Sequence, residues 1–97
     1  MFARVTTNQV KPDQIEAAIN SFQEQVGSVA KKMAGFKGSY FLVDRQTGKI
    51  VGVALWDKKE NLDASDKVAA EIRAKIRQAS AATSSGTVEI YEVAAQF

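Results

Sequence analysis

The segment Lys49–Trp56, with the sequence KIVGVALW, constrains the fold of this chain more than any other feature. Its density of apolar and β-branched residues favours an extended strand. A strand with one face in water alternates apolar and polar side chains, but this segment leaves no clear polar face. The sequence therefore predicts a strand that is covered on both sides. The residues that carry this pattern are Ile50, Val51, Val53, Ala54, Leu55 and Trp56.

A second strand is predicted directly before this one. Residues 38–43 (GSYFLV) are rich in aromatic and branched side chains, which favour a strand. The intervening residues 44–48 (DRQTG) begin with Asp and end with Gly, which is the composition of a tight turn. The two strands and their turn together predict a β-hairpin.

An amphipathic helix is predicted ahead of the hairpin, after a first strand over residues 2–7. Pro12 suits the first turn of a helix, and Asp13 and Glu16 place negative charge near its positive end. Gly35 is the expected stop at the other end. Apolar residues recur at steps of three and four, typical of one buried helix face: Ile15, Ala18, Ile19, Phe22, Val26, Val29, Ala30 and Met33.

A second helix is predicted after Trp56. Asp57 and Glu60 resemble a capping pair at its start, and Ser65 and Asp66 are a point where the helix could restart after a kink. Its apolar stripe consists of Leu62, Ser65, Val68, Ala69, Ile72, Ile76 and Ala79. The charged residues between them are interpreted as its solvated face: Lys67, Glu71, Arg73, Lys75 and Arg77.

The chain ends with a small, polar loop over residues 80–86 and a last strand over residues 87–97. The order is therefore β-α-β-β-α-β, the ferredoxin-like α+β fold, with a four-stranded antiparallel sheet and two helices on one face. We expect one domain over residues 1–97. Two helices cover only one face of the sheet, so we expect a homodimer in which the partner covers the other face.

The chemistry open to the chain is limited by two missing residue types. There is no Cys and no His, which removes thiol nucleophiles, disulfides, the commonest general base and the commonest metal ligand. Asp44, Asp57 and Glu60 fit a turn and a helix start and do not form a metal-ligand cluster, so we predict no metal site. The net charge is +2 with basic residues spread along the chain, so we expect no nucleic-acid binding.

The first ten residues, MFARVTTNQV, lack the basic and apolar regions of a signal peptide. No apolar run approaches the length that spans a bilayer. The sequence alone therefore leads us to expect a cytoplasmic protein that does not associate with membranes.

Residues 35–42 (GFKGSYFL) and 53–60 (VALWDKKE) resemble the core signature of the antibiotic biosynthesis monooxygenase domain, and residues 88–93 (VEIYEV) fit its last strand. The resemblance implies the dimeric α+β barrel superfamily, in which two ferredoxin-like subunits pack their sheets face to face. Members include small cofactor-independent monooxygenases that oxidise polycyclic aromatic phenols to quinones. The resemblance places Trp56 at a pocket between helices and sheet.

Haem-degrading monooxygenases belong to the same group, but the resemblance does not extend to them. That branch carries a His on the second helix, where this chain has Ser65, Asp66 and Lys67. It also carries an Asn in the first strand, whereas Asn8 stands only at the end of that strand. We therefore expect no haem degradation and no cofactor.

Five residues are candidates for binding a small aromatic ligand: Trp56, Phe22, Tyr40, Arg4 and Tyr91. Trp56 is either a pocket wall or plain core packed against Phe22. Tyr40 and Tyr91 could donate hydrogen bonds to a phenolic or quinone oxygen, or pack at the sheet and interface. Arg4 could stabilise a substrate oxyanion, or lie exposed on its strand.

The working hypothesis is a cofactor-independent monooxygenase acting on an aromatic, polyketide-like small molecule. In this chemistry the substrate forms an electron-rich anion that reacts with O₂. The alternative is a non-enzymatic dimer of the same superfamily that binds a small ligand or takes part in a stress response. Because no residue pattern assigns a catalytic base, the sequence does not decide between them.

Overall fold

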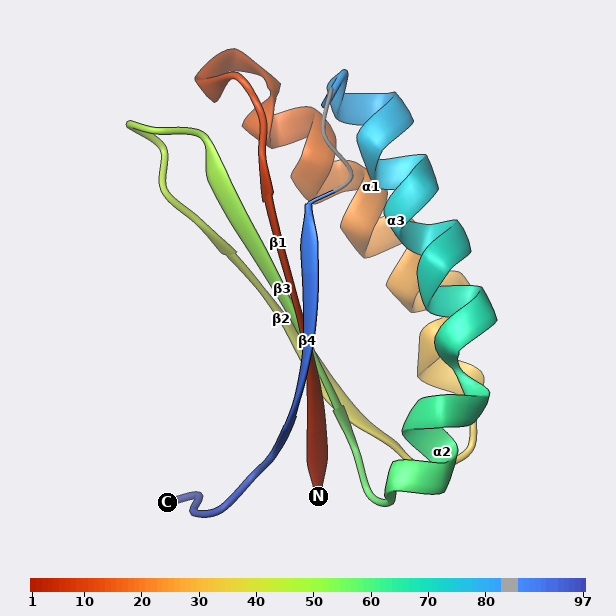
Figure 1. Cartoon of the computed structure of the whole chain (residues 1–97). Helices are drawn as coiled ribbons and strands as arrows, with labels where there is room; N and C mark the ends of the chain where they lie inside the picture. Colours follow the sequence, from red (N-terminus) through yellow and green to blue (C-terminus); the bar gives the residue numbers. More distant parts are fainter. Residues whose placement is uncertain (83–85) are drawn as a thin grey trace.

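The computed structural model describes residues 1–82 and 86–97. Four strands, β1 (Phe2–Gln9), β2 (Phe36–Val43), β3 (Lys49–Trp56) and β4 (Thr87–Glu92), form one sheet in the order β2-β3-β1-β4. All three neighbouring pairs are antiparallel. The α-helices α1 (Ile15–Ser28), α2 (Lys59–Ala64) and α3 (Asp66–Ser80) lie on one face of this sheet (Figure 1). The predicted ferredoxin-like α+β fold is confirmed.

The helices differ in detail from the predicted ones. The first predicted helix is divided into the 3₁₀ turn η1 (Pro12–Gln14), α1 and the 3₁₀ turn η2 (Ala30–Lys32). The second is broken at Ser65 into α2 and α3, as the predicted restart suggested. None of the helices in the described part of the chain is long and apolar enough to cross a membrane.

The predicted capping role of Asp57 is wrong. The helix α2 begins at Lys59, and its N-cap residue Lys58 makes no side-chain capping bond. The Asp57 carboxylate instead accepts a hydrogen bond from Asn61 Nδ2 at 2.7 Å, and the Asp57 backbone N–H donates to the Gly35 carbonyl. The turn prediction is confirmed, because Asp44 Oδ1 accepts the backbone N–H groups of Gln46 and Thr47.

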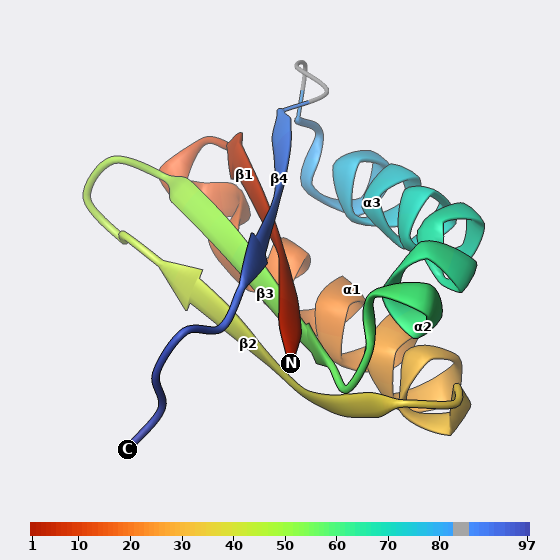
Figure 2. The same ribbon diagram turned by 60° about the horizontal axis from the view of Figure 1, so that its bottom comes forward.

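The last strand is shorter than predicted. It ends at Glu92, and residues 93–97 have no regular secondary structure. Figures 1 and 2 show these residues leading away from the helices. The predicted loop over 80–86 begins where α3 ends, and residues 83–85 of it lie outside the described residues.

The strand register decides which side chains face the helices. Arg4 lies opposite both Ala54 and Ile90, and residues directly opposite one another share a face of the sheet. This is the helix-covered face. Residues one position along, such as Val5 and its partner Val53, face the other way. We call this second side the uncovered face, because neither view shows an element packed on it (Figures 1 and 2).

The core lies between the helices and the sheet. At one end, Val10, Ile15, Ala18 and Ile50 form a buried cluster. At the other end, Trp56 and Leu62 are almost completely buried. The candidate site is lined by residues from both ends, among them Ile50 and Trp56.

Candidate functional site

A cavity of about 100 Å³ lies between the sheet and the helices α1 and α3. Its size is below the roughly 150 Å³ of an apolar cavity that admits benzene, so a single aromatic ring would need a small outward movement of the lining side chains or would extend to the solvent side. Most of its wall is apolar, as in ligand pockets generally. The apolar side chains that line it include Phe22, Val26, Met33, Phe36, Phe41, Ile50, Trp56, Val68, Ile72 and Ile76.

Trp56 closes the cavity at the end of β3. The residue is 2% exposed, and its ring meets Phe36 edge to face with centroids 5.5 Å apart. Its indole Nε1–H is buried and has no hydrogen-bond acceptor within the described residues. A buried donor without a partner costs free energy, about 1–3 kcal/mol from mutational data. A ligand oxygen or a water molecule in the cavity would relieve that cost.

Phe22 also lines the cavity, from α1. Its ring stacks on Phe41 of β2, with centroids 4.6 Å apart and an interplanar angle of 20°. The sequence predicts Phe22 as the packing partner of Trp56. Among the described residues, however, the aromatic ring that pairs with Trp56 is that of Phe36. The two aromatic pairs hold two separate parts of the cavity wall.

Gly52 forms part of the sheet side of the cavity. A Cβ atom built at this position would meet only one atom within 4 Å, Phe41 Cδ1 at 3.9 Å. The space above this glycine is therefore open, and its missing side chain contributes to the cavity. Glycine inside a strand often marks a place where a ligand or another backbone approaches closely.

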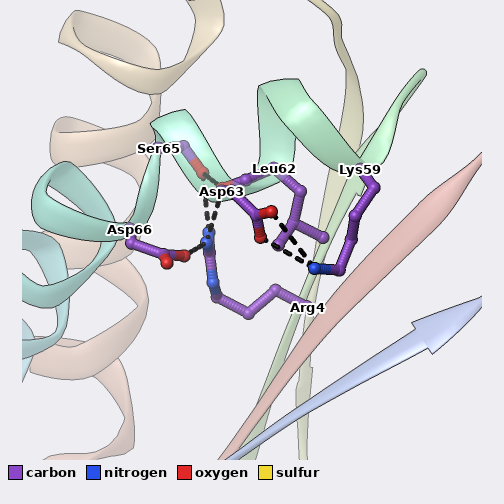
Figure 3. Close-up of polar contacts among 6 residues, drawn as sticks. All are labelled: Arg4, Lys59, Leu62, Asp63, Ser65 and Asp66. Carbon is purple, nitrogen blue, oxygen red and sulfur yellow. Dashed lines mark hydrogen bonds and ion pairs between the residues drawn. The ribbon is translucent and has the colours of Figure 1, made fainter.

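Arg4 is buried at 4% exposure, so the expectation of an exposed strand arginine is wrong. Its guanidinium group reaches from β1 to the break between α2 and α3 (Figure 3). Nη1 donates to Ser65 Oγ at 2.9 Å, and Nη2 donates to the Leu62 carbonyl at 2.9 Å and pairs with Asp66. These contacts occupy the guanidinium group, so Arg4 holds the helix break against the sheet.

Two further arginines on α3 line the cavity, Arg73 and Arg77. Both are half-buried, which places them where the cavity meets solvent. Neither forms an ion pair or a side-chain hydrogen bond with another described residue. Burial lowers the pKa of Arg73, and the neighbouring charges of Arg4 and Arg77 lower it further. The cavity therefore carries uncompensated positive charge.

Tyr40 and Tyr91, the two predicted tyrosine donors, lie outside this cavity. Tyr40 is opposite Val53 on the uncovered face and is 59% exposed. Tyr91, opposite Ala3, faces the same way and is 49% exposed. Its hydroxyl donates to Glu89 Oε2, and this hydrogen bond raises its pKa. The structure therefore brings together Trp56, Phe22 and Arg4, but not the tyrosines.

Arg73, Arg77 and Gly52 were not predicted as site residues, although the sequence holds a signal for each. Ser65, Ala69, Arg73 and Arg77 follow one another at steps of four, so they form a single row beside the apolar stripe of α3. Because Arg73 and Arg77 continue the row that begins with Ser65 and Ala69, this spacing places them at the edge of the core. Gly52 interrupts an otherwise apolar strand, which is the usual sign of a close approach.

The sequence matches the family model described as antibiotic biosynthesis monooxygenase over residues 1–70. It is 30% identical over 95 residues to the uncharacterized protein Rv2557 of Mycobacterium tuberculosis. That alignment covers 98% of this chain and 42% of the relative. A second uncharacterized protein of that organism, Rv2558, is 30% identical over 73 residues, covering 75% of this chain and 31% of the relative. The chain thus spans less than half the length of these relatives.

The fold is similar to that of a monooxygenase from the gene ActVA-Orf6 of Streptomyces coelicolor, solved in complex with the ligand nanaomycin D. The TM-score is 0.80 at 15% identity, covering 99% of this chain and 89% of that one. A conserved protein from Methanosarcina mazei Go1 gives a TM-score of 0.71 at 19% identity, covering 93% and 89%. At these identities the likeness concerns the fold.

Proposed function

Since the chain belongs to the antibiotic biosynthesis monooxygenase family, we propose that it is a cofactor-independent monooxygenase acting on a small aromatic molecule in the cavity beside Trp56. The observation that carries this proposal is the buried indole N–H, without an acceptor among the described residues, of a side chain that lines a mostly apolar cavity. Such a donor is free to bond an oxygen atom on a ring that packs against the apolar wall.

The reaction fits the residues that line the cavity. A phenol reacts with O₂ to give a quinone and one water molecule: one oxygen atom enters the ring, the other becomes water, and the ring supplies four electrons. Substrate and O₂ together balance this step, without a further reductant. The protein would exclude water, orient the ring against Phe36 and Trp56, and stabilise negative charge with Arg73 and Arg77.

Oxygen consumption tests the proposal directly. Purified protein is incubated with mono- and bicyclic phenols and with anthrone, while O₂ and quinone absorbance are followed. Trp56→Phe keeps an aromatic ring but removes the N–H donor, and it is expected to lower kcat/KM by about tenfold or more. Gln78→Ala, at an exposed position of α3, serves as the control. Equal rates for Trp56→Phe and the parent protein would overturn the assigned role of the indole.

A non-enzymatic, ligand-binding dimer is the second candidate, and one observation favours it. None of the described residues that line the cavity is an Asp, Glu, Lys or Tyr, and the chain has no His or Cys. The cavity therefore offers no ordinary general base. Saturable binding of phenols without O₂ uptake by any of them would favour this candidate.

Homodimerisation through the uncovered face is part of the same proposal. Exposed apolar and aromatic side chains gather on that face, among them Tyr40, Leu42 and Tyr91. Exposed patches of this kind mark interaction surfaces. A second copy packed sheet to sheet would bury them, as the α+β barrel requires.

A further inference from the structure

The strand β2 contains one residue more than its partner β3 at the end that borders the cavity. Phe36 lies opposite Trp56 and Gly38 lies opposite Leu55. Lys37, between Phe36 and Gly38, is therefore opposite no residue of β3. This is a β-bulge, an extra residue that bends its strand and can redirect the side chains on either side of it.

The bulge decides which side chain of β2 enters the cavity. Side chains of a regular strand alternate between the two faces of the sheet. Ser39 and Phe41 line the cavity. Regular alternation would place Lys37 beside them and turn Phe36 to the uncovered face. In the structure Phe36 lines the cavity and Lys37 is exposed, so the wall beside Trp56 receives an aromatic ring in place of an ammonium group.

Gly38 provides the backbone conformation of this bulge. Its φ of +136° is one that residues with a side chain rarely adopt. A Cβ atom built there would meet no atom of the described residues within 4 Å. A substitution of Gly38 therefore acts through the backbone conformation and not through crowding.

Two contacts fix the chain on the other side of the bulge. The Asp57 N–H donates to the Gly35 carbonyl at 2.9 Å, so the pairing of the two segments continues past the bulge. The Asp57 carboxylate accepts a hydrogen bond from Asn61 Nδ2 of α2 at 2.7 Å. Because the chain is held on both sides of the bulge, the Phe36 ring stays edge to face with Trp56, with centroids 5.5 Å apart.

We propose that Lys37 and Gly38 are positioning residues, whose bulge places the Phe36 ring in the cavity wall and keeps the lysine out of it. The ring, packed against Trp56, sets how far an apolar ligand enters at this end of the cavity. A lysine in the same wall would have to bury its charge or lose its proton. The inference rests on the proposed function for the site, and not for the reaction.

4-Nitrophenol is the probe, because it has one ring and quenches the fluorescence of Trp56, the single tryptophan of the chain. Gly38→Ala is expected to weaken its binding by about fivefold or more, because the bulge shifts and the Phe36 ring leaves its place. The near-ultraviolet circular dichroism of Trp56 should change as well, and this measurement needs no ligand. Gly27→Ala is the matched control and should change neither, since an added Cβ at this exposed position of α1 also meets no described atom within 4 Å.

Deletion of Lys37 distinguishes a positioning role from a merely structural one. Without the extra residue, regular pairing brings Phe36 opposite Trp56, and position 38 no longer needs a positive φ. Gly38→Ala combined with the deletion is therefore expected to recover the binding and the Trp56 spectrum that Gly38→Ala alone loses. If Gly38→Ala alone does not fold, recovery of the fold by the deletion supports the inference in the same way.

Phe36→Leu provides a second test through a double-mutant cycle. If Gly38 acts through the Phe36 ring, Gly38→Ala should weaken nitrophenol binding no further in the Phe36→Leu background. A parent-like spectrum and affinity in Gly38→Ala, failure of the deletion to recover them, or additive losses in the cycle would overturn the inference.

The outcomes also separate this inference from the proposed function. Loss of the Trp56 spectrum in Gly38→Ala and its recovery by the deletion, without O₂ uptake from any phenol, would sink the monooxygenase and leave the positioning role in place. O₂ uptake, nitrophenol binding and a Trp56 spectrum that are all unaffected by Gly38→Ala would sink the positioning role and leave the monooxygenase.

Discussion

Arg4 donates a hydrogen bond to Ser65, 61 residues later, and so ties the first strand of the sheet to the break between α2 and α3. Ser65 in turn donates to the Leu62 carbonyl at 2.6 Å, which Arg4 also reaches. Arg4, Ser65 and Trp56 all line the cavity. The shape of that end therefore depends on one buried guanidinium group.

Arg4→Met is expected to lower the free energy of unfolding by about 2–4 kcal/mol, because it removes the buried hydrogen bonds of the guanidinium group to Ser65 Oγ and the Leu62 carbonyl and leaves Ser65 Oγ without that donor. Urea denaturation followed by Trp56 fluorescence measures this loss. Arg45→Met is the control, since Arg45 forms an exposed ion pair with Glu16 and its loss should cost less than about 1 kcal/mol. Similar losses in the two variants would show that the Arg4 network contributes little.

Gly52→Ala is expected to stabilise the protein by about 0.4–1 kcal/mol and to weaken ligand binding in the cavity. The backbone tolerates a side chain here, because the added Cβ meets only Phe41 at an ordinary contact distance. Gly52→Val should weaken binding further, since its methyl groups occupy the space of a ligand. Thermal unfolding and nitrophenol titration measure the two effects.

Gly48→Ala is the contrasting control for this glycine. Gly48 has a φ of +83°, and a Cβ there would collide with the Val10 carbonyl oxygen. This variant should therefore destabilise the fold.

Tighter ligand binding by Gly52→Val would contradict the assignment of the cavity as the site.

The elements of the fold could be predicted because their apolar spacing reflects burial against the sheet. The predicted strand Lys49–Trp56 has the same bounds as the observed β3. The end of β4 could not be predicted from its own residues, because it depends on pairing. Glu92 lies opposite Phe2, where β1 begins, and the Val93 N–H donates to the carbonyl of Met1, so the residues after Val93 have no residue of β1 to pair with.

The site was predictable only in part, for a similar reason. Trp56 stands out as a single large side chain at the end of a strand. Arg73 and Arg77 stand among other charges of α3, and only the packing of that helix separates them from Lys75, which faces solvent. Arg4 is an isolated charge within its strand, so the sequence alone does not predict that it is buried. In the fold Ser65 and Asp66 lie beside it, and Arg4 is the centre of a buried network.

Asn61→Ala is expected to change how stability depends on pH. The hydrogen bond from Asn61 holds the pKa of the Asp57 carboxyl below its ordinary value of 3.8. A lowered pKa in the folded state gives stability that is present above 3.8 and lost as pH falls through the folded-state value. The variant should lose stability at neutral pH and show a shallower decline in acid.

Urea midpoints measured from neutral pH down to about pH 2 test this expectation. Asn20→Ala, at an exposed position of α1, is the control and should leave the slope unchanged. If the difference between Asn61→Ala and the parent protein stays the same at every pH, the Asp57–Asn61 bond does not contribute to acid sensitivity.

Leu42→Glu is expected to convert a dimer into a monomer, as seen by sedimentation at micromolar concentration. Leu42 is 52% exposed on the uncovered face, where a charge would have to be buried between two sheets. Val88→Glu is the matched control: Val88 is 44% exposed, but it lies opposite Thr6 on the helix-covered side. A parent protein that sediments as a monomer, or equal dissociation by the two variants, would rule out pairing through this face. In that case the apolar residues of β3 that point away from the helices would need another partner.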